Sequence, residues 1–102
     1  MNNISIDNRL FEWDDDKAEL NWKKHHVDFN DAAKVFNDPN RIEDFDEEHS
    51  DYEDRWRVIG KVDDILFVVY TERGDYTRLI SAREATATER RIYYDRANIY
   101  KL

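Results

Sequence analysis

The segment "ILFVVYTERGDYTRLISAR", residues 65–83, decides the fold of this chain. Residues 65–72 are almost all apolar and β-prone, which predicts a strand at the centre of a sheet. The triplet "RGD" at 73–75 is typical of a tight turn, and residues 76–83 can then pair back as a second strand. We therefore expect an antiparallel hairpin as the middle of the domain.

The residues before this hairpin extend the sheet. Residues 55–62, "RWRVIGKV", alternate between apolar and polar side chains and predict a strand that a turn at 63–64 connects to the hairpin. Residues 41–45 form a weaker strand candidate. The acidic run between them, residues 46–54, is typical of a solvated loop.

Two helices are expected before those strands. After a short strand at 10–13, Asp14 is a plausible N-cap for a first helix that ends in a basic turn, an order that suits the helix dipole. Asp28 can cap a second helix that "NDP" at 37–39 stops. On the first helix Ala18, Trp22 and His25 share one face, and we expect Trp22 and Trp56 to belong to the core.

A third helix follows the hairpin, because Thr86 and Glu89 form a capping box. The element order β-α-α-β-β-β-β-α predicts an α+β fold with a mainly antiparallel sheet, two N-terminal helices and one C-terminal helix. We expect one domain over residues 1–102, with residues 1–9 as a flexible tail.

The composition narrows the functional class. The 102 residues contain 40% hydrophobic residues, no cysteine and a formal net charge of −8. No apolar run approaches the roughly 20 residues of a membrane helix, and the start lacks a signal-peptide pattern, so we expect a cytoplasmic protein without a membrane partner. The charge is uneven: residues 1–64 have a net charge of −10, and residues 65–102 a net charge of +2. An anionic ligand is therefore expected at the C-terminal third.

Metal and cofactor sites are not expected. His25 and His26 are adjacent, so a helix would point them about 100° apart, and His49 is distant in the sequence. The chain has no cysteine ligands, no calcium-loop spacing and no glycine-rich phosphate loop.

A set of cations on the predicted strands is the main candidate for chemistry. Arg83 ends the last strand, and Arg78 should point to the opposite face if that strand is regular. RNA cleavage without a metal needs proton transfer at the 2′-hydroxyl and at the 5′-oxygen, together with cations at the phosphate. The other candidates are the cations Arg55, Arg57 and Arg73 and the proton carriers Lys24, His25, Glu89 and Tyr93. The alternatives are ordinary ones: surface salt bridges for the arginines, a histidine at the edge of the core for His25, and packing for Tyr93.

The order of several motifs resembles the BrnT family of toxins. "FEWDDDKAELNWKKHHVDFNDAAKVFND" (11–38) is similar to a family pattern that runs F-x-W-D, then K, N, K-H-G, F, A and F. "RWRVIG", "VVYTERGD", "RLISAREAT" and "ERRIYY" follow in the family's order, so the resemblance covers about residues 10–94. His26 stands where the family has glycine, a residue suited to a left-handed helix cap, which leaves open a different end for the first helix.

The resemblance implies a RelE-like fold and the toxin of a type II toxin–antitoxin pair. Such a toxin is a metal-independent endoribonuclease that cuts RNA, inhibits translation and arrests growth. The implied partner is a cognate BrnA-like antitoxin with a ribbon-helix-helix part, through which alone the complex would contact operator DNA. The positions that match the family's polar pattern are Lys24, His25, Arg55, Arg73, Arg83, Glu89 and Tyr93. We expect Arg83 to bind the phosphate with Arg55 or Arg73 assisting, and His25 or Lys24 to serve in proton transfer or charge stabilisation.

Two other functions are compatible with the sequence. The first is a non-catalytic domain that binds the antitoxin and acts as a co-repressor. The second is a DNA-binding protein built on the helix pair at 14–37. The second helix of that pair carries Asp31 and Asp38 with Lys34 as its cation, which suits a phosphate backbone poorly.

Overall fold

A six-stranded sheet organises the molecule, which we describe from a computed structural model over residues 2–101. The strand order is β1-β2-β6-β5-β4-β3, and every neighbouring pair is antiparallel except β2 and β6. This confirms the predicted α+β fold with a mainly antiparallel sheet. The strands are β1 (Asn2–Ile6), β2 (Arg9–Trp13), β3 (Ile42–Phe45), β4 (Trp56–Val62), β5 (Asp64–Arg73) and β6 (Tyr76–Glu84).

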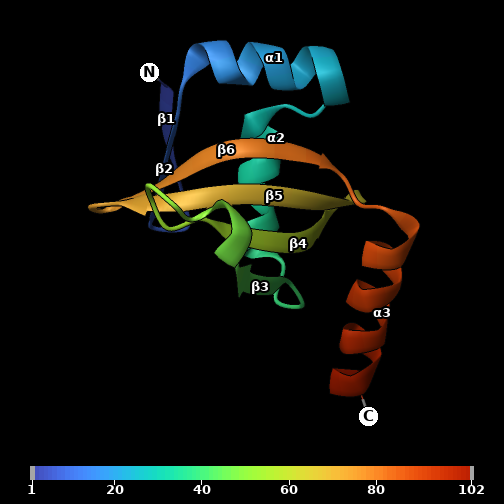
Figure 1. Ribbon diagram of the computed structural model, residues 1–102. Coiled ribbons are helices and arrows are strands. Elements are labelled where there is room, and N and C mark those ends of the chain that lie inside the picture. Colours follow the sequence, from blue (N-terminus) through green and yellow to red (C-terminus); the bar gives the residue numbers. More distant parts are fainter. Residues whose placement is uncertain (1, 102) are drawn as a thin grey trace.

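The helices lie at three sides of the sheet. β2 pairs with only the first residues of β6, and α1 runs alongside β6 (Figure 1). α2 lies behind the sheet, and α3 leaves the end of β6 and projects away. The second predicted helix is one α-helical turn followed by a 3-10 helix, and the acidic loop contains a further 3-10 turn. The bounds are α1 (Asp15–His25), α2 (Phe29–Ala32), η1 (Ala33–Asn37), η2 (Glu47–His49) and α3 (Ala87–Lys101).

The core fills the space between one sheet face and the α2–η1 segment. Gly60 of β4 is required there, because a Cβ atom at this position would lie 2.9 Å from the Cβ of Val35 in η1. The glycine therefore lets η1 rest directly on the sheet. The largest fully buried side chains of this core are those of Phe11, Phe29, Val35, Val58, Val68 and Leu79.

The predicted helix caps are present. The Asp14 carboxylate accepts hydrogen bonds from the amides of Asp16 and Lys17, and that of Asp28 accepts one from Asn30. The capping box of α3 is reciprocal: the Glu89 amide donates to the Thr86 hydroxyl, and the Thr86 amide donates to the Glu89 carboxylate. These short-range features follow directly from local sequence.

The N-terminal residues, expected as a flexible tail, instead form an edge strand. β1 pairs with β2 along its whole length, and Ile4 and Ile6 pack against the core. A two-residue turn at Asp7 and Asn8, with φ of 50° and 70°, connects the two strands. Asp and Asn are residues that tolerate this conformation in hairpin turns.

The prediction that Trp22 is a core residue is wrong, because its side chain is 51% exposed. The buried residue of α1 is its neighbour Asn21, at 5% exposure. α1 ends at His25 with His26 in the left-handed conformation, at φ 54° and ψ 33°, so the helix end is the one a glycine would give. The rings of Trp22 and His26 meet edge to face at 5.3 Å, a contact that accompanies this strained cap.

β6 is not a regular strand. Leu79 is opposite Tyr70 and Ser81 is opposite Val69, so Ile80 is an extra residue in the ladder. Such a bulge reverses the alternation of side chains beyond it. Because Arg78 and Arg83 are opposite Thr71 and Phe67, four residues apart on β5, they lie on the same face. The expectation that they point to opposite faces is wrong for this reason.

Candidate functional site

A polar clamp joins α1 to the edge of β6. The Asn21 amide group donates to the carbonyls of Val27 and Ala82, at 3.0 and 2.8 Å, and its oxygen accepts from the Ala82 amide at 2.9 Å. Asn21 thus pairs with β6 as a neighbouring strand residue would, beyond the point where β2 stops pairing. This fixes the C-terminal half of α1 beside Ser81 and Arg83.

A groove of about 230 Å³ lies between α1 and β6. We call it the α1–β6 groove. On its α1 wall Lys17 and Lys24 are two helical turns apart, and His25 follows Lys24 directly. Ser81 and Ile80, on either side of the bulge, line it from β6. The side chains that line the groove are those of Lys17, Leu20, Asn21, Lys24, His25, Ile80 and Ser81.

Arg83 lies two residues beyond Ser81 on the same face of the strand. Its guanidinium makes a bidentate ion pair with the Glu89 carboxylate, at 2.8 and 3.0 Å, and lies 4.1 Å over the Phe67 ring. A further hydrogen bond goes to the carbonyl of Glu84. These bonds use three of the five N–H donors of the guanidinium, so two donors stay available in a fixed position.

Glu89 holds Arg83 from the first turn of α3. The ion pair with Arg83 keeps the pKa of the Glu89 carboxyl below its ordinary value, and the amide of Thr86 adds to this effect. Burial acts in the opposite direction but is the weaker influence. Glu89 is therefore ionised at neutral pH and well suited to orient the guanidinium.

Arg78 is the second cation of β6 on this face. Its side chain is 11% exposed and lies 3.7 Å from the Glu12 carboxylate of β2. The positions of Arg78 and Arg83 are about 13 Å apart along the sheet, because their partners on β5 differ by four residues. Ser81 lies between them.

Arg55 and Arg73 are at the other end of the sheet. Both guanidinium groups approach the Glu53 carboxylate of the acidic loop, at 4.0 and 3.8 Å. Arg73 is six residues from Phe67, the partner of Arg83, which corresponds to about 20 Å along β5. The two ends of the sheet therefore cannot contact the same phosphate.

The acidic loop is tied to the sheet near these arginines. The carbonyl of Asp54 accepts a hydrogen bond from the Thr71 hydroxyl, and the Asp46 amide donates to the carbonyl of Arg55. The Asp46 carboxylate also contacts the His49 ring at 3.0 Å. Arg57 is separately engaged by Asp44 in a bidentate pair, so the arginines at this end neutralise loop and β3 carboxylates.

Tyr93 lies apart from the groove. Its side chain is buried, and its hydroxyl donates to the Asp38 carboxylate, which also accepts from the Lys61 amide. Burial and this hydrogen bond raise the pKa of the Tyr93 hydroxyl above its ordinary value. Tyr93 fastens α3 to the body of the molecule, which agrees with the packing interpretation.

The structure thus divides the candidates from the sequence into three groups. Lys24 and His25 line the α1–β6 groove, with Arg83 and Glu89 next to it. Arg55 and Arg73 surround Glu53, and Tyr93 contacts Asp38. Sequence reasoning missed Lys17, whose spacing of seven from Lys24 was a usable signal, and it misplaced Arg78 because nothing in the sequence marks the bulge.

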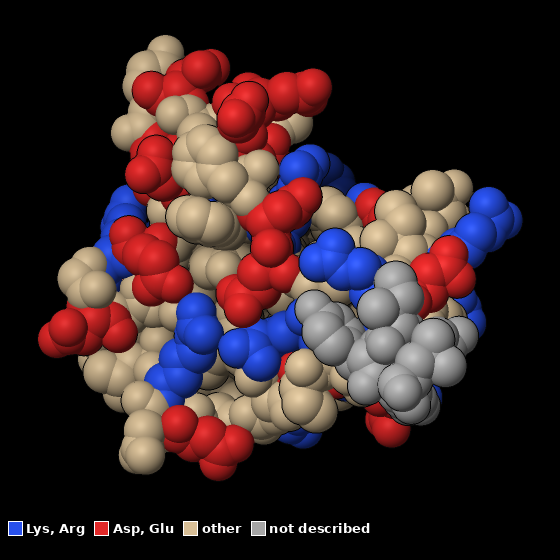
Figure 2. Space-filling view, turned by 90° about the horizontal axis from the view of Figure 1, so that it is seen from below, with Lys and Arg blue, Asp and Glu red and all other residues tan. Residues whose placement is uncertain are grey.

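The rest of the surface is mixed in sign. On the side turned away from α1, acidic side chains cover much of the face and Lys and Arg side chains lie between them (Figure 2). Among the described residues, no three His, Asp or Glu side chains converge as metal ligands would. No helix in that part of the chain is both long and apolar enough to cross a membrane.

Comparison with known proteins identifies the family. The family model described as "Ribonuclease toxin, BrnT, of type II toxin-antitoxin system" matches residues 13–89. The crystal structure of the Brucella abortus ribonuclease toxin BrnT is similar at a TM-score of 0.58 and 26% identity, over 74% of this chain and 95% of that one. No curated protein matches the sequence significantly. The matched region contains both the α1–β6 groove and the Arg83–Glu89 pair, and this chain belongs to the BrnT family of ribonuclease toxins of type II toxin–antitoxin systems.

Proposed function

We propose that this chain is an endoribonuclease toxin that cuts RNA at the α1–β6 groove with its own side chains and without a metal ion. The observation that carries the proposal is the placement of Lys24 and His25 on one side of Ser81 with the rigidly held Arg83 beside it. Membership of a family of ribonuclease toxins supports the same reaction class.

The reaction is a transfer of the phosphoryl group to the neighbouring 2′-oxygen. The 2′-hydroxyl loses its proton to a base while its oxygen bonds to phosphorus, and the bond from phosphorus to the 5′-oxygen breaks. A second proton goes to that leaving oxygen, which leaves a 2′,3′-cyclic phosphate and a free 5′-hydroxyl. We assign one proton transfer to His25, because imidazole is the side chain that most often performs it.

The cations have separate roles in this assignment. Arg83 binds the phosphate oxygens through its two remaining N–H donors, and the negative charge that develops on phosphorus strengthens these bonds. Lys24 adds positive charge from α1. Glu89 orients Arg83 and carries no proton. Arg55 and Arg73 are too distant to share the scissile phosphate, and Tyr93 has a structural role.

The biological context follows from the same assignment. Cleavage of messenger RNA in the cytoplasm inhibits translation and arrests growth. A cognate antitoxin of the ribbon-helix-helix class neutralises the toxin by covering the groove, and the complex contacts operator DNA only through the antitoxin. Masking the cations of the groove would remove both the phosphate contact and the proton carriers.

Two observations favour a second function, a non-catalytic antitoxin-binding domain that acts as a co-repressor. Arg83 is already neutralised by Glu89, and the chain has a net charge of −8, which opposes binding to RNA. In this alternative the fold and the antitoxin contact are retained while the groove is inert.

Growth and RNA cleavage together decide between the two functions. We expect induction of the chain to arrest growth and the purified protein to cut single-stranded RNA in excess EDTA, with a 2′,3′-cyclic phosphate at the new end. Normal growth, intact RNA and tight binding of the antitoxin would instead establish the co-repressor.

A further inference from the structure

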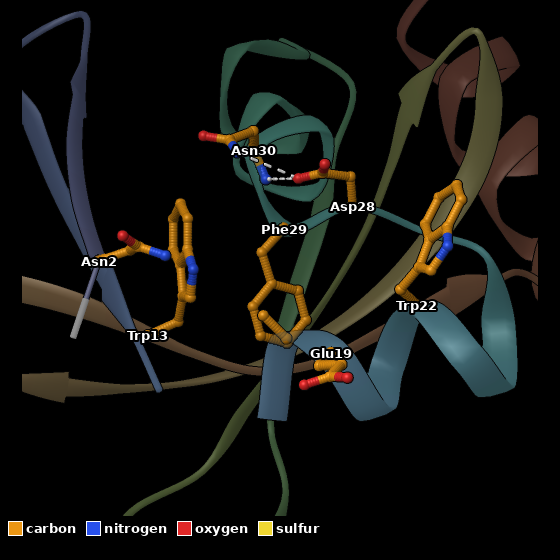
Figure 3. Close-up of a pocket in the computed structure, with 8 residues that line it drawn as sticks. Asn2, Trp13, Glu19, Trp22, Asp28, Phe29 and Asn30 are labelled. Atoms are coloured by element: carbon orange, nitrogen blue, oxygen red, sulfur yellow. Dashed lines mark hydrogen bonds between the residues drawn. The ribbon is translucent and has the colours of Figure 1, made fainter. Parts of the chain in front are cut away.

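A second hollow lies on the opposite side of α1 from the α1–β6 groove. Its volume is about 260 Å³, and it is enclosed by β1, β2, α1 and the start of α2. We call it the Trp13–Trp22 hollow. The indole of Trp13 and the ring of Phe29 lie next to each other, and Trp22 stands on α1 at the other side (Figure 3). The Trp13 and Phe29 rings meet edge to face at 5.9 Å.

A large apolar side chain is exposed on this side of α1. Trp22, which lines the hollow, is 51% exposed. Large apolar side chains exposed beside a hollow mark interaction surfaces, and tryptophan is enriched among the residues that dominate binding energy. Trp22 therefore has the position of an anchor for another molecule.

The polar lining of the hollow is acidic. Glu19 and Asp28 contribute carboxylates, and no Lys or Arg is among the described residues that line it. Within the described part of the chain, both hydrogen bonds of the Asp28 carboxylate go to Oδ1, from the amide and the side chain of Asn30, so Oδ2 is available. Glu19 pairs with Lys23, at 3.2 Å with both side chains 67% exposed, and an exposed pair of this kind opens at little cost.

Aromatic rings next to carboxylates bind one kind of side chain particularly well. A guanidinium group can stack on indole while its N–H groups donate to carboxylates, and it is more weakly hydrated than an ammonium group. RNA is disfavoured here, because carboxylates repel phosphates. The charge of the hollow is thus opposite to that of the α1–β6 groove.

We propose that the Trp13–Trp22 hollow receives an arginine side chain of the cognate antitoxin, an inference that rests on the proposed toxin function. An α-helix with its side chains is about 10–12 Å across, so a segment anchored in the hollow needs to pass over only α1 to reach the groove. The hollow supplies affinity, and the part of the antitoxin beyond it blocks Lys24, His25 and Arg83.

The test uses the whole toxin and the antitoxin encoded next to it. We expect the double variant Glu19→Lys/Trp22→Ala to bind the antitoxin about 30-fold more weakly, as loss of a central anchor does. Its RNA cleavage should equal that of wild type, because neither residue lines the groove. The matched control Glu47→Lys makes the same charge change on the acidic loop and should bind within about twofold of wild type.

A direct probe adds a readout that does not depend on activity. Titration with N-acetyl-L-arginine amide should shift the indole N–H resonance of Trp22 in a saturable way, and uridine monophosphate should leave it unchanged. Unchanged antitoxin affinity in the double variant, or a response of Trp22 to the nucleotide instead of the arginine, would overturn the assignment. A wild-type chain that binds the antitoxin but cuts no RNA would refute the proposed activity and leave the hollow intact as a docking site.

Discussion

On the sheet face opposite α2 and η1, the arginines at the two ends differ in how firmly their guanidinium groups are held. At the groove end, Arg83 is held by two short bonds to Glu89, by a carbonyl and by the Phe67 ring. At the loop end, Arg55 and Arg73 approach a single carboxylate at 4.0 and 3.8 Å. We infer that a cation becomes useful for catalysis when its position is fixed, some donors are left over and a groove lies beside it. Arg83 meets these conditions, whereas Arg55 and Arg73 make only long contacts.

The largest expected effect is on catalysis. Arg83→Ala should lower the single-turnover rate of RNA cleavage by about 100- to 1,000-fold, the usual loss when one donor to a transition-state oxyanion is removed. Arg83→Lys should rescue little, because an ammonium group cannot reproduce the fork. Arg73→Ala, the matched change at the loop end, should cut RNA within about threefold of wild type. Equal losses of cleavage rate in the Arg83→Ala and Arg73→Ala variants would contradict the difference between the two ends. Circular dichroism would check that both variants fold.

The hydrogen bonds of Asn21 to β6, at the groove end, should have the largest effect on the free energy of unfolding. Asn21→Ala leaves the amide and carbonyl of Ala82 without partners at the edge of β6, and it should lower the free energy of unfolding by about 3 kcal/mol. Urea denaturation would measure this. The exposed Asn30, whose side chain donates one hydrogen bond to Asp28, gives the control: Asn30→Ala should lower the free energy of unfolding by less than about 0.5 kcal/mol. A loss as small for Asn21 would mean that α1 is held by other contacts.

The ion pair at the groove end should make stability depend on pH. The folded-state pKa of Glu89 is depressed, so its contribution is present above the ordinary value of 4.5 and is lost as the pH falls through the lower folded value. Glu89→Gln keeps the capping box and removes the charge. We expect Glu89→Gln to lower the free energy of unfolding by about 1 kcal/mol at pH 7, because solvent screens an ion pair whose Arg83 side chain is one-third exposed. Below pH 4.5 the loss should be smaller.

The carboxylate at the loop end, Glu53, provides the matched comparison for Glu89. Glu53→Gln should change the free energy of unfolding by less than about 0.5 kcal/mol at either pH, because its contacts are long and exposed. Denaturation curves of both variants at pH 7 and pH 3.5 provide the comparison. A pH-independent cost for Glu89→Gln would show that the ion pair is not what holds Arg83.

The smallest effect concerns the end of α1. His26→Gly should raise the free energy of unfolding by up to about 1 kcal/mol, because glycine adopts the left-handed conformation without strain. The loss of the ring contact with Trp22 offsets part of the gain. Thermal melting would measure the difference. A clear loss of stability would show that the aromatic contact outweighs the strain.

The sequence predicted those parts of the fold that depend on neighbours along the chain. The hairpin at 65–83, the caps at Asp14 and Asp28 and the box of Thr86 and Glu89 involve residues a few positions apart. The prediction that Trp22 is a core residue failed, because an interpretation from the 3.6-residue period requires that the helix packs on an apolar surface. α1 instead lies along a strand edge, where free amide and carbonyl groups require a polar partner, and Asn21 supplies it.

The candidate site was predicted only in part for a similar reason. Family resemblance selected Lys24, His25, Arg83 and Glu89, which the structure places in or beside one groove. The same resemblance included Arg55 and Arg73, since a sequence pattern does not record that Arg73 lies about 20 Å away and that Arg55 approaches the same carboxylate, Glu53. The position of Arg78 depends on an extra residue in β6, and only the pairing with β5 reveals that bulge.

The most direct test of the central claim is where RNA binds. An oligonucleotide with 2′-O-methyl groups lacks the attacking hydroxyl, so it can be titrated into isotope-labelled protein without being cut. We expect the largest amide shifts in the α1–β6 groove, at Lys24, His25, Ser81 and Arg83. Shifts centred on Glu53, Arg55 and Arg73 would contradict the account and place the RNA at the loop end of the sheet.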